Sequence, residues 1–116
     1  MTPPISPQVF QVLLSLADGP QHGYAIVKDI RERTNDEVCL TASTLYDALA
    51  RLVDQSLIQE LDAPPDRTDH DARRRYYQLT RLGRQAAEGE AKRLERVLEM
   101  ARDKRLLPDS RSRGRR

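Results

Sequence analysis

The stretch TASTLYDALARLV, residues Thr41–Val53, decides the fold of this chain. Its apolar residues recur at the spacing of one helix face, and they are Leu45, Leu49, Leu52 and Val53. Thr41 fits the N-cap position, because its hydroxyl can accept a hydrogen bond from a free amide of the first turn. The stretch therefore predicts an amphipathic helix that lies against a core.

The polar face of this helix carries side chains that could contact DNA. Short hydroxyls, a phenol and an arginine near a helix start suit phosphates and base edges. These residues are Ser43, Thr44, Tyr46, Asp47 and Arg51. Asp47 could either repel phosphate or accept a hydrogen bond from cytosine N4. Taken alone, the stretch also fits an ordinary amphipathic helix, so its neighbours decide between the two interpretations.

Two further helices are expected before this stretch. Ser6 and Pro7 are typical of an N-cap followed by the first helical residue, and Asp18-Gly19-Pro20 ends that helix. The second helix should cover roughly Gly23–Arg33, with apolar members Tyr24, Ile26, Val27 and Ile30. A short extended link, Val38-Cys39-Leu40, follows. The second and third helices then form a helix-turn-helix, whose third helix would enter the major groove by its N-terminal end.

After the third helix, the pattern changes from helix to strand. Leu57–Leu61 and Arg75–Leu79 are rich in strand-forming residues, and the long polar segment Asp62–Arg74 separates them. We expect a β-hairpin with a wide tip, which would be the wing of a winged helix. Its returning arm carries Arg73, Arg74 and Arg75. Such a run could be a solvated surface, but beside a helix-turn-helix it favours contact with phosphates or the minor groove.

A long last helix should begin after Thr80 and continue to about Leu107. Small and apolar residues recur along it in a heptad pattern, namely Ala87, Ala91, Leu94, Leu98 and Ala101. A helix of about 27 residues is roughly 40 Å long, which is more than a small core can cover. The pattern therefore favours packing against a second copy of the chain over folding back on its own domain.

The expected fold is mainly α with a small β-hairpin. It consists of a winged helix-turn-helix DNA-binding domain at 1–80, a dimerisation helix at 81–107 and a basic, disordered tail at 108–116. A length of 116 residues suits about one domain, and 38% hydrophobic with 33% charged residues implies a small core.

Charge and hydropathy indicate the kind of partner. Residues 1–65 hold 4 Lys/Arg and 9 Asp/Glu, a net charge of −5, whereas residues 66–116 hold 16 and 9, a net charge of +7. A basic half suits a polyanionic partner such as DNA. The apolar runs are too short to span a membrane and no leader opens the chain, so we expect a cytoplasmic protein with no membrane partner.

Enzymatic chemistry is not expected. His22 and His70 lie far apart in sequence and neither has the spacing of a metal site, so no metal or cofactor is predicted. There is no glycine-rich phosphate loop and no Ser-His-Asp arrangement. Cys39, the single cysteine, should be a small buried side chain rather than a nucleophile or a redox sensor.

Three motifs together resemble the PadR-type transcriptional regulators. They are His22-Gly23-Tyr24, Thr44-Leu45-Tyr46 followed by Ala48–Leu52, and Arg73–Gly83. The likeness runs from about Val9 to Leu107, and the single C-terminal helix is similar to the compact subgroup of that family. Two features differ from the family pattern: Ser56 stands where a glycine is usual, and the chain lacks the tryptophan that some compact members use to bind flat aromatic ligands.

The resemblance implies a homodimeric winged-helix repressor whose last helix packs against the partner subunit. It also implies that Tyr46 and the neighbouring hydroxyls meet DNA with support from the wing arginines. We therefore expect a sequence-specific DNA-binding transcriptional regulator that acts on an inverted-repeat operator. The alternative is a winged-helix protein–protein interaction module without specific DNA binding, and the basic wing favours DNA. A small-molecule effector of unknown type would fit a hydrophobic crevice between the first helix and the partner's last helix.

Overall fold

The computed structural model describes residues 5–62 and 75–108. Its elements, in chain order, are α1 (Pro7–Leu16), β1 (Gln21–His22), α2 (Gly23–Arg33), α3 (Ala42–Asp54), β2 (Ile58–Leu61), β3 (Tyr76–Leu79) and α4 (Arg81–Asp103). The expected fold class, mainly helical with a small sheet and a long last helix, is confirmed. Arg73 and Arg74, the wing tip and the tail residues 109–116 lie outside the described residues.

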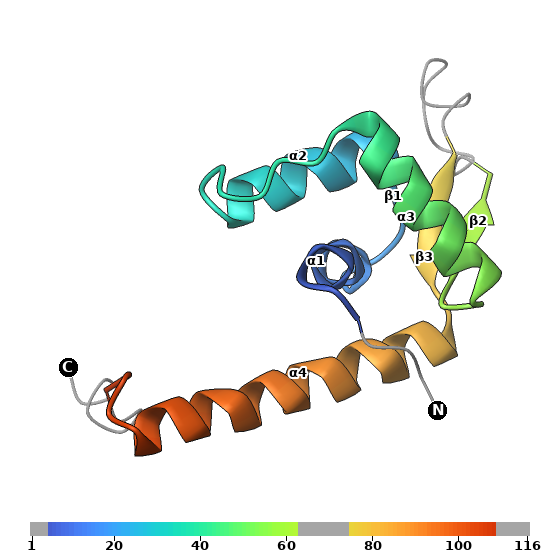
Figure 1. The fold of residues 1–116 in the computed structure, drawn as a ribbon. Coiled ribbons are helices and arrows are strands. Elements are labelled where there is room, and N and C mark those ends of the chain that lie inside the picture. Colours follow the sequence, from blue (N-terminus) through green and yellow to red (C-terminus); the bar gives the residue numbers. More distant parts are fainter. Residues whose placement is uncertain (1–4, 63–74, 109–116) are drawn as a thin grey trace.

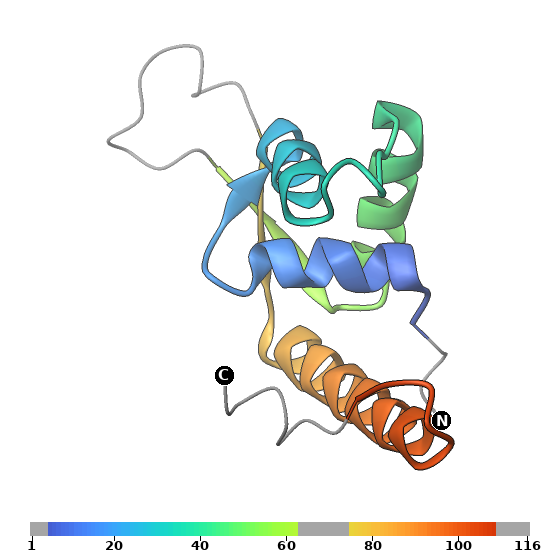
Figure 2. The same ribbon diagram turned by 90° about the vertical axis from the view of Figure 1, so that its left-hand side faces the viewer.

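Helix α1 lies at the centre of the molecule. Two perpendicular views show α2 and α3 on one side of it and α4 on the other (Figures 1 and 2). The core-facing side chains of α1, α2 and α3 are completely or almost completely buried. They include Val12, Leu13 and Leu16 of α1, Ile26 and Ile30 of α2, and Leu45, Leu49 and Leu52 of α3. The predicted apolar face of the third helix is therefore a core face, as expected from its spacing.

Side chains cap the starts of all four described helices. Ser6 Oγ accepts from the Val9 amide at 3.1 Å, and Pro7 is the first helical residue. Thr41 Oγ1 accepts from Thr44 N at 3.1 Å and Thr80 Oγ1 from Gly83 N at 3.0 Å. These three caps confirm the prediction. The fourth, His22 Nδ1 accepting from Ala25 N at 3.1 Å, was not predicted.

The sheet has three strands in the order β1-β3-β2, and both pairings are antiparallel. Strands β2 and β3 form the predicted hairpin, in which Ile58 is opposite Leu79 and Leu61 opposite Tyr76. The added strand β1 pairs Gln21 with Tyr77. Two residues are too few to show a strand periodicity in the sequence, so β1 could not be predicted.

Two expectations about burial were wrong. Tyr24 was expected on the apolar face of α2 but is 66% exposed, because it lies two positions, or about 200°, from the buried Ile26. Cys39 was expected to be buried but is exposed. In the extended link, Val38 is half-buried and Leu40 buried, and both contact the core. Cys39 lies beside them, and its thiol donates to the Asp36 carbonyl at 3.3 Å.

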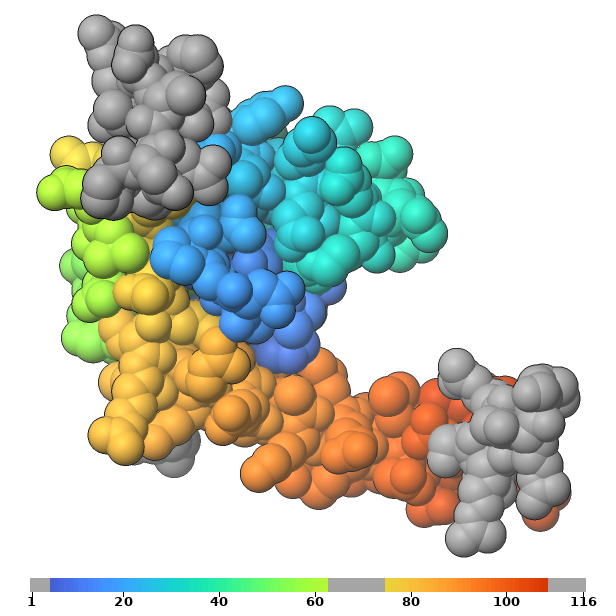
Figure 3. All heavy atoms as spheres, turned by 180° about the vertical axis from the view of Figure 1, so that it is seen from behind, coloured from blue at the N-terminus to red at the C-terminus, as the bar shows by residue number. Residues whose placement is uncertain are grey.

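Helix α4 begins against the core and then leaves it. Gly83 is buried, Arg84 Nη2 donates to the Ala17 carbonyl at 2.7 Å, and Ala86 and Ala87 pack against core residues. Beyond these turns the helix stands clear of the other elements, as seen from behind (Figure 3). It ends at Asp103 rather than near Leu107. None of the helices within residues 5–62 and 75–108 combines the length and the hydropathy of a membrane-spanning helix.

Candidate nucleic-acid interface

The exposed face of α3 carries the predicted DNA-contacting residues. Successive helix residues are about 100° apart, so Ser43, Asp47 and Ala50 lie on the side opposite the buried Leu45 and Leu49. All three outward residues are exposed. The centre of the outer face of α3 is therefore exposed to solvent, which is what a helix entering a groove requires.

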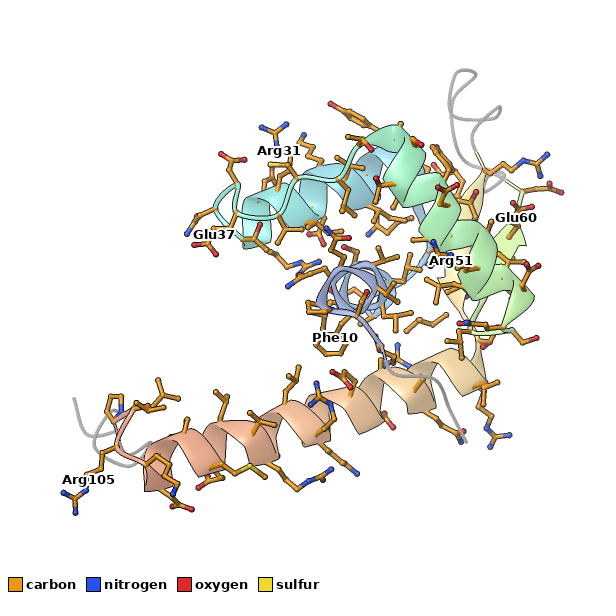
Figure 4. The ribbon with its side chains drawn as sticks, in the orientation of Figure 1. Phe10, Arg31, Glu37, Arg51, Glu60 and Arg105 are labelled. Atoms are coloured by element: carbon orange, nitrogen blue, oxygen red, sulfur yellow. The ribbon has the colours of Figure 1, made fainter. Side chains whose placement is uncertain are left out.

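The predicted residues of α3 also extend onto its two flanks. Thr44, Asp47 and Arg51 line a groove of about 260 Å³ that α3 forms with the start of α1, where Ser6 and Gln8 also contribute. In Figure 4, Arg51 lies on α3 at the side that faces α1. The predicted residues do share one helix, but Arg51 and Tyr46 lie on opposite flanks of that helix and border different hollows.

Tyr46 lies on the flank of α3 that faces the wing. It is 50% exposed and borders an open hollow of about 610 Å³ between α2, α3 and the sheet. The other residues that line this hollow are His22, Gly23, Tyr24, Glu60, Arg75 and Tyr77. The structure thus brings Tyr46 and Arg75, which lie far apart in sequence, to the same surface hollow.

The wing side of this hollow is partly neutralised. Arg75 Nη1 lies 3.2 Å from Glu60 Oε1, and these side chains are 71% and 44% exposed, so Arg75 can exchange this ion pair for a phosphate contact. Glu60 is labelled on the wing in Figure 4. Burial, together with the Glu60 carboxylate, raises the pKa of the Tyr77 phenol, so this hydroxyl keeps its proton at neutral pH.

A second exposed strip, on α2, was missed in the sequence. Tyr24 and Lys28 are one helical turn apart and both are exposed, and Arg31 follows on the same side. They line one shallow pocket with Val27, Glu32 and Asp36. Arg31 Nε is paired with Asp36 Oδ1 at 3.2 Å. The helical spacing of the sequence could have indicated this strip, because its residues lie on the side of α2 opposite the apolar residues Ile26 and Ile30, which are buried.

Catalytic and metal-binding arrangements were not expected. Over residues 5–62 and 75–108, no group of three or more His, Cys, Asp or Glu side chains is placed to hold a metal ion. The exposed side chains around α3 and the wing are hydroxyls, phenols, carboxylates and guanidinium groups.

The sequence of residues 12–89 matches the family described as the transcriptional regulator PadR-like family. The chain belongs to this family. It is a PadR-like transcriptional regulator with a DNA-binding winged helix, and not an enzyme. The family resemblance of the three sequence motifs is thereby confirmed.

A protein relative and two solved structures support the assignment, and a third solved structure shares the fold. The chain is 38% identical over 86 residues to a 37.1 kDa protein in transposon TN4556 of Streptomyces fradiae, and the match covers 74% of this chain but 22% of that protein. A PadR family transcription regulator from Clostridium difficile R20291 superposes with a TM-score of 0.71 at 26% identity, over 82% of this chain and 94% of its own. A transcriptional regulator from Clostridium thermocellum superposes with a TM-score of 0.68 at 26% identity, over 82% of this chain and 89% of its own.

The third structure is Bacillus subtilis PadR in complex with operator DNA. It has a TM-score of 0.61 at 21% identity, over 72% of this chain and 46% of that one, and it shows that the fold is shared. The PadR-like chain therefore shares its winged helix-turn-helix fold with a protein that has been crystallised in complex with operator DNA.

Two sequence motifs of this PadR-like regulator meet in space. A side-chain carbon built on Gly23 would overlap the hydroxyl of Tyr46, so the phenol occupies the space that glycine leaves open. His22 caps α2, stacks on Tyr24 with 6.4 Å between ring centroids, and meets Tyr76 edge-on at 5.4 Å. The glycine of the motif at the start of α2 therefore leaves room for the tyrosine of α3.

The predicted dimerisation residues of the PadR-like chain have different surroundings. Ala87 packs against the core of its own chain. Leu94 and Ala101 are half-buried, whereas Ala91 and Leu98 are exposed. Large apolar side chains nearby are also exposed, with Val97 at 42%, Leu98 at 45% and Met100 at 60%. The apolar surface that could receive a partner therefore lies in the half of α4 beyond Ala87.

Proposed function

We propose that this chain is a homodimeric transcriptional repressor that binds an inverted-repeat operator in the cytoplasm. Residues 1–80 would form the DNA-binding domain, 81–107 the dimerisation helix and 108–116 a basic tail with unspecific DNA contacts. Ser43, Thr44, Tyr46, Asp47 and Arg51 would contact the major groove, and Arg73, Arg74 and Arg75 would contact phosphates or the minor groove.

One observation carries this proposal: Tyr46 of α3 and Arg75 of the wing border the same exposed hollow. A duplex that inserts between the start of α3 and the wing would meet both side chains at once. The operator complex of Bacillus subtilis PadR, which has the same fold, supports this choice of ligand.

The dimer proposal rests on the exposed apolar side chains of α4. Two copies of α3 related by a two-fold axis would read half-sites about one helical turn apart, which makes the operator an inverted repeat. The same interface offers a place for a small-molecule effector in the crevice between α1 and the partner's α4. In Figure 4, Phe10 extends from α1 toward α4 and would form part of its apolar wall.

The test starts with duplexes selected from random DNA by the full-length chain. Mobility shifts with the selected duplex are then measured for Arg74→Ala at several salt concentrations. Loss of one phosphate contact should weaken binding to all sequences and reduce the slope of log K against log salt by about 0.9. Arg105→Ala removes the same charge at the far end of the molecule from the wing, and its slope should be unchanged (Figure 4).

Tyr46→Ala tests the groove contact itself. We expect it to weaken binding to the selected duplex more than to an unrelated duplex, because a base or groove contact depends on sequence. If Tyr46→Ala and wild type bound the selected duplex with equal affinity, the assignment of α3 to the DNA interface would be wrong. If the wild-type chain shifts no duplex even at low salt, the alternative of a protein-interaction module is favoured.

A further inference from the structure

Gly23 makes an unusual close contact with the tyrosine of α3. It is the first residue of α2, is buried, and follows His22, whose side chain caps the helix. A side-chain carbon at this position would overlap the Tyr46 hydroxyl, and it would lie 2.9 Å from Tyr46 Cζ and 3.3 Å from Cε1. Real side-chain carbons essentially never approach other atoms closer than 3.0 Å, as the contacts with the hydroxyl and Cζ would require, so any larger residue would displace the phenol.

The kind of atom in this contact decides the consequence. Tyr46 is 50% exposed, and the overlapping atoms are at the far end of its side chain, which can move by rotation about two torsions. At Gly83, by contrast, an added carbon would overlap the backbone carbonyl of Leu57, which cannot rotate away. A side chain at position 23 should therefore move the tyrosine but keep the fold intact, whereas a side chain at position 83 should destabilise the fold.

We propose that Gly23 is a positioning residue for operator recognition: by lacking a side chain, it seats the Tyr46 phenol against the start of α2. This inference rests on the proposed DNA-binding role of Tyr46. A seated ring loses less conformational freedom when it meets DNA than a freely rotating one, and its hydroxyl is presented in one place. Gly23 thus acts through Tyr46 and does not itself need to touch DNA.

The chain supplies its own control for a glycine-to-alanine change. Gly89 lies within α4, is exposed, and an added carbon there would meet nothing within 4 Å. Gly89→Ala therefore makes the same chemical change in a helix without touching Tyr46. Gly83→Ala is the opposite reference, a variant whose stability should fall because its new methyl group meets backbone.

The experiment has two readouts, one in the free protein and one with DNA. The ring signals of Tyr46 are followed by NMR in the free protein, and they are identified by their loss in Tyr46→Ala. Affinity for the selected duplex is then measured for wild type, Gly23→Ala, Tyr46→Ala and the double variant, together with thermal midpoints for all of them and for Gly89→Ala and Gly83→Ala.

We expect Gly23→Ala to shift the Tyr46 ring signals, to keep a thermal midpoint close to that of wild type and to lose roughly tenfold in duplex affinity. In the Tyr46→Ala background the same change should have little further effect, because the ring that it displaces is gone. Gly89→Ala should leave both the Tyr46 signals and the affinity unchanged, and the midpoint of Gly83→Ala should fall.

Unchanged Tyr46 signals in free Gly23→Ala would overturn the positioning contact, whatever the chain binds. An equal affinity loss in the presence and absence of Tyr46 would also overturn it, since Gly23 would then act by another route. Failure of the wild-type chain to select any duplex would instead overturn the proposed function, and it is seen before any variant is compared.

Discussion

At the scale of single residues, Ser56 adopts a backbone conformation that favours glycine. Its φ is 63°, in the left-handed region. The Ser56 amide donates to the Val53 carbonyl and the Leu57 amide to the Leu52 carbonyl, both at 2.9 Å, which is the Schellman pattern of hydrogen bonds that ends a helix. Ser56 therefore occupies the C′ position of this turn, where glycine is favoured, and its side chain makes the left-handed conformation strained.

Replacing Ser56 by glycine should stabilise the fold. A left-handed conformation costs a residue with a side chain about 1–2 kcal/mol. Glycine loses about 0.5–1 kcal/mol through the extra freedom of the unfolded chain. We therefore expect Ser56→Gly to raise the free energy of unfolding by roughly 0.5–1 kcal/mol, measured by urea denaturation.

Gln55 provides the control for this substitution. It is the neighbouring C-cap residue of α3, with φ of −84°, so it has no left-handed strain for glycine to relieve. Gln55→Gly should lower the free energy of unfolding, opposite in sign to Ser56→Gly. If both variants were destabilised, strain at Ser56 would not be the reason for the difference.

At the scale of elements, a polar cluster joins α1 to α2. Asp29 Oδ2 accepts from Arg33 Nε and from Ser15 Oγ, both at 2.8 Å. Arg33 also reaches the Gln11 side chain at 2.7 Å and the Ser15 hydroxyl at 2.7 Å. Because both helices contribute, this cluster fixes how α2, and with it the start of the helix-turn-helix, sits on the central helix.

This cluster should make the stability of the fold depend on acidity. Burial of Asp29 acts to raise its pKa, but the hydrogen bonds from Arg33 and Ser15 and the guanidinium charge more than offset burial, so the pKa lies below its ordinary value of 3.8. A carboxyl group with a lowered pKa stabilises the folded state fully above its ordinary pKa. That contribution is lost as pH falls through the lowered value.

Asp29→Asn isolates this contribution. We expect the variant to be less stable than wild type at neutral pH, and the difference to shrink as unfolding is followed by circular dichroism from about pH 6 down to about pH 2. Asp54→Asn, an exposed change at the end of α3, makes the same loss of charge outside the cluster. A pH-independent difference for Asp29→Asn would mean that its amide, rather than its charge, causes the instability.

The starts of helices were predictable where the sequence has a residue that favours the N-cap position. The caps Ser6, Thr41 and Thr80 and the period of the apolar faces located the starts of three helices. The end of α4 was not predictable, because its Schellman turn is made by Arg105, with φ of 65°, and arginine gives no sign of a left-handed residue. The short strand β1 forms only because β3 is beside it, which is a tertiary contact rather than a local preference.

At the scale of the whole molecule, the sequence predicted which residues are exposed on α3 but not which of them lie together. Tyr46 faces Gly23 and Arg75, while Thr44 and Arg51 face α1, because α3 crosses between the wing and the central helix (Figure 1). Only packing of all three helices determines that division. The wing arginines Arg73 and Arg74 lie outside the described residues, so their contribution stays a prediction.

The last helix has more apolar surface than residues 5–62 and 75–108 cover. Val97, Leu98 and Met100 are 42%, 45% and 60% exposed, and they follow the turns that pack on the core. Burial of one aliphatic side chain contributes about 1.5–3 kcal/mol, so pairing two such surfaces would favour association. We expect Leu98→Glu to convert the proposed dimer to a monomer, because it would place two carboxylates in an apolar contact.

Sedimentation velocity over a range of protein concentrations measures this change, with Arg96→Gln as the matched control. Arg96 lies about 160° around the helix from Leu98 and is exposed, and its replacement makes the same change of one negative unit in net charge. Arg96→Gln should stay dimeric. Leu98→Glu should also lose affinity for an inverted-repeat duplex far more than for a single half-site, because separate monomers lose the gain from linked binding. A wild-type chain that sediments as a monomer at all concentrations would refute the dimer and, with it, the inverted repeat.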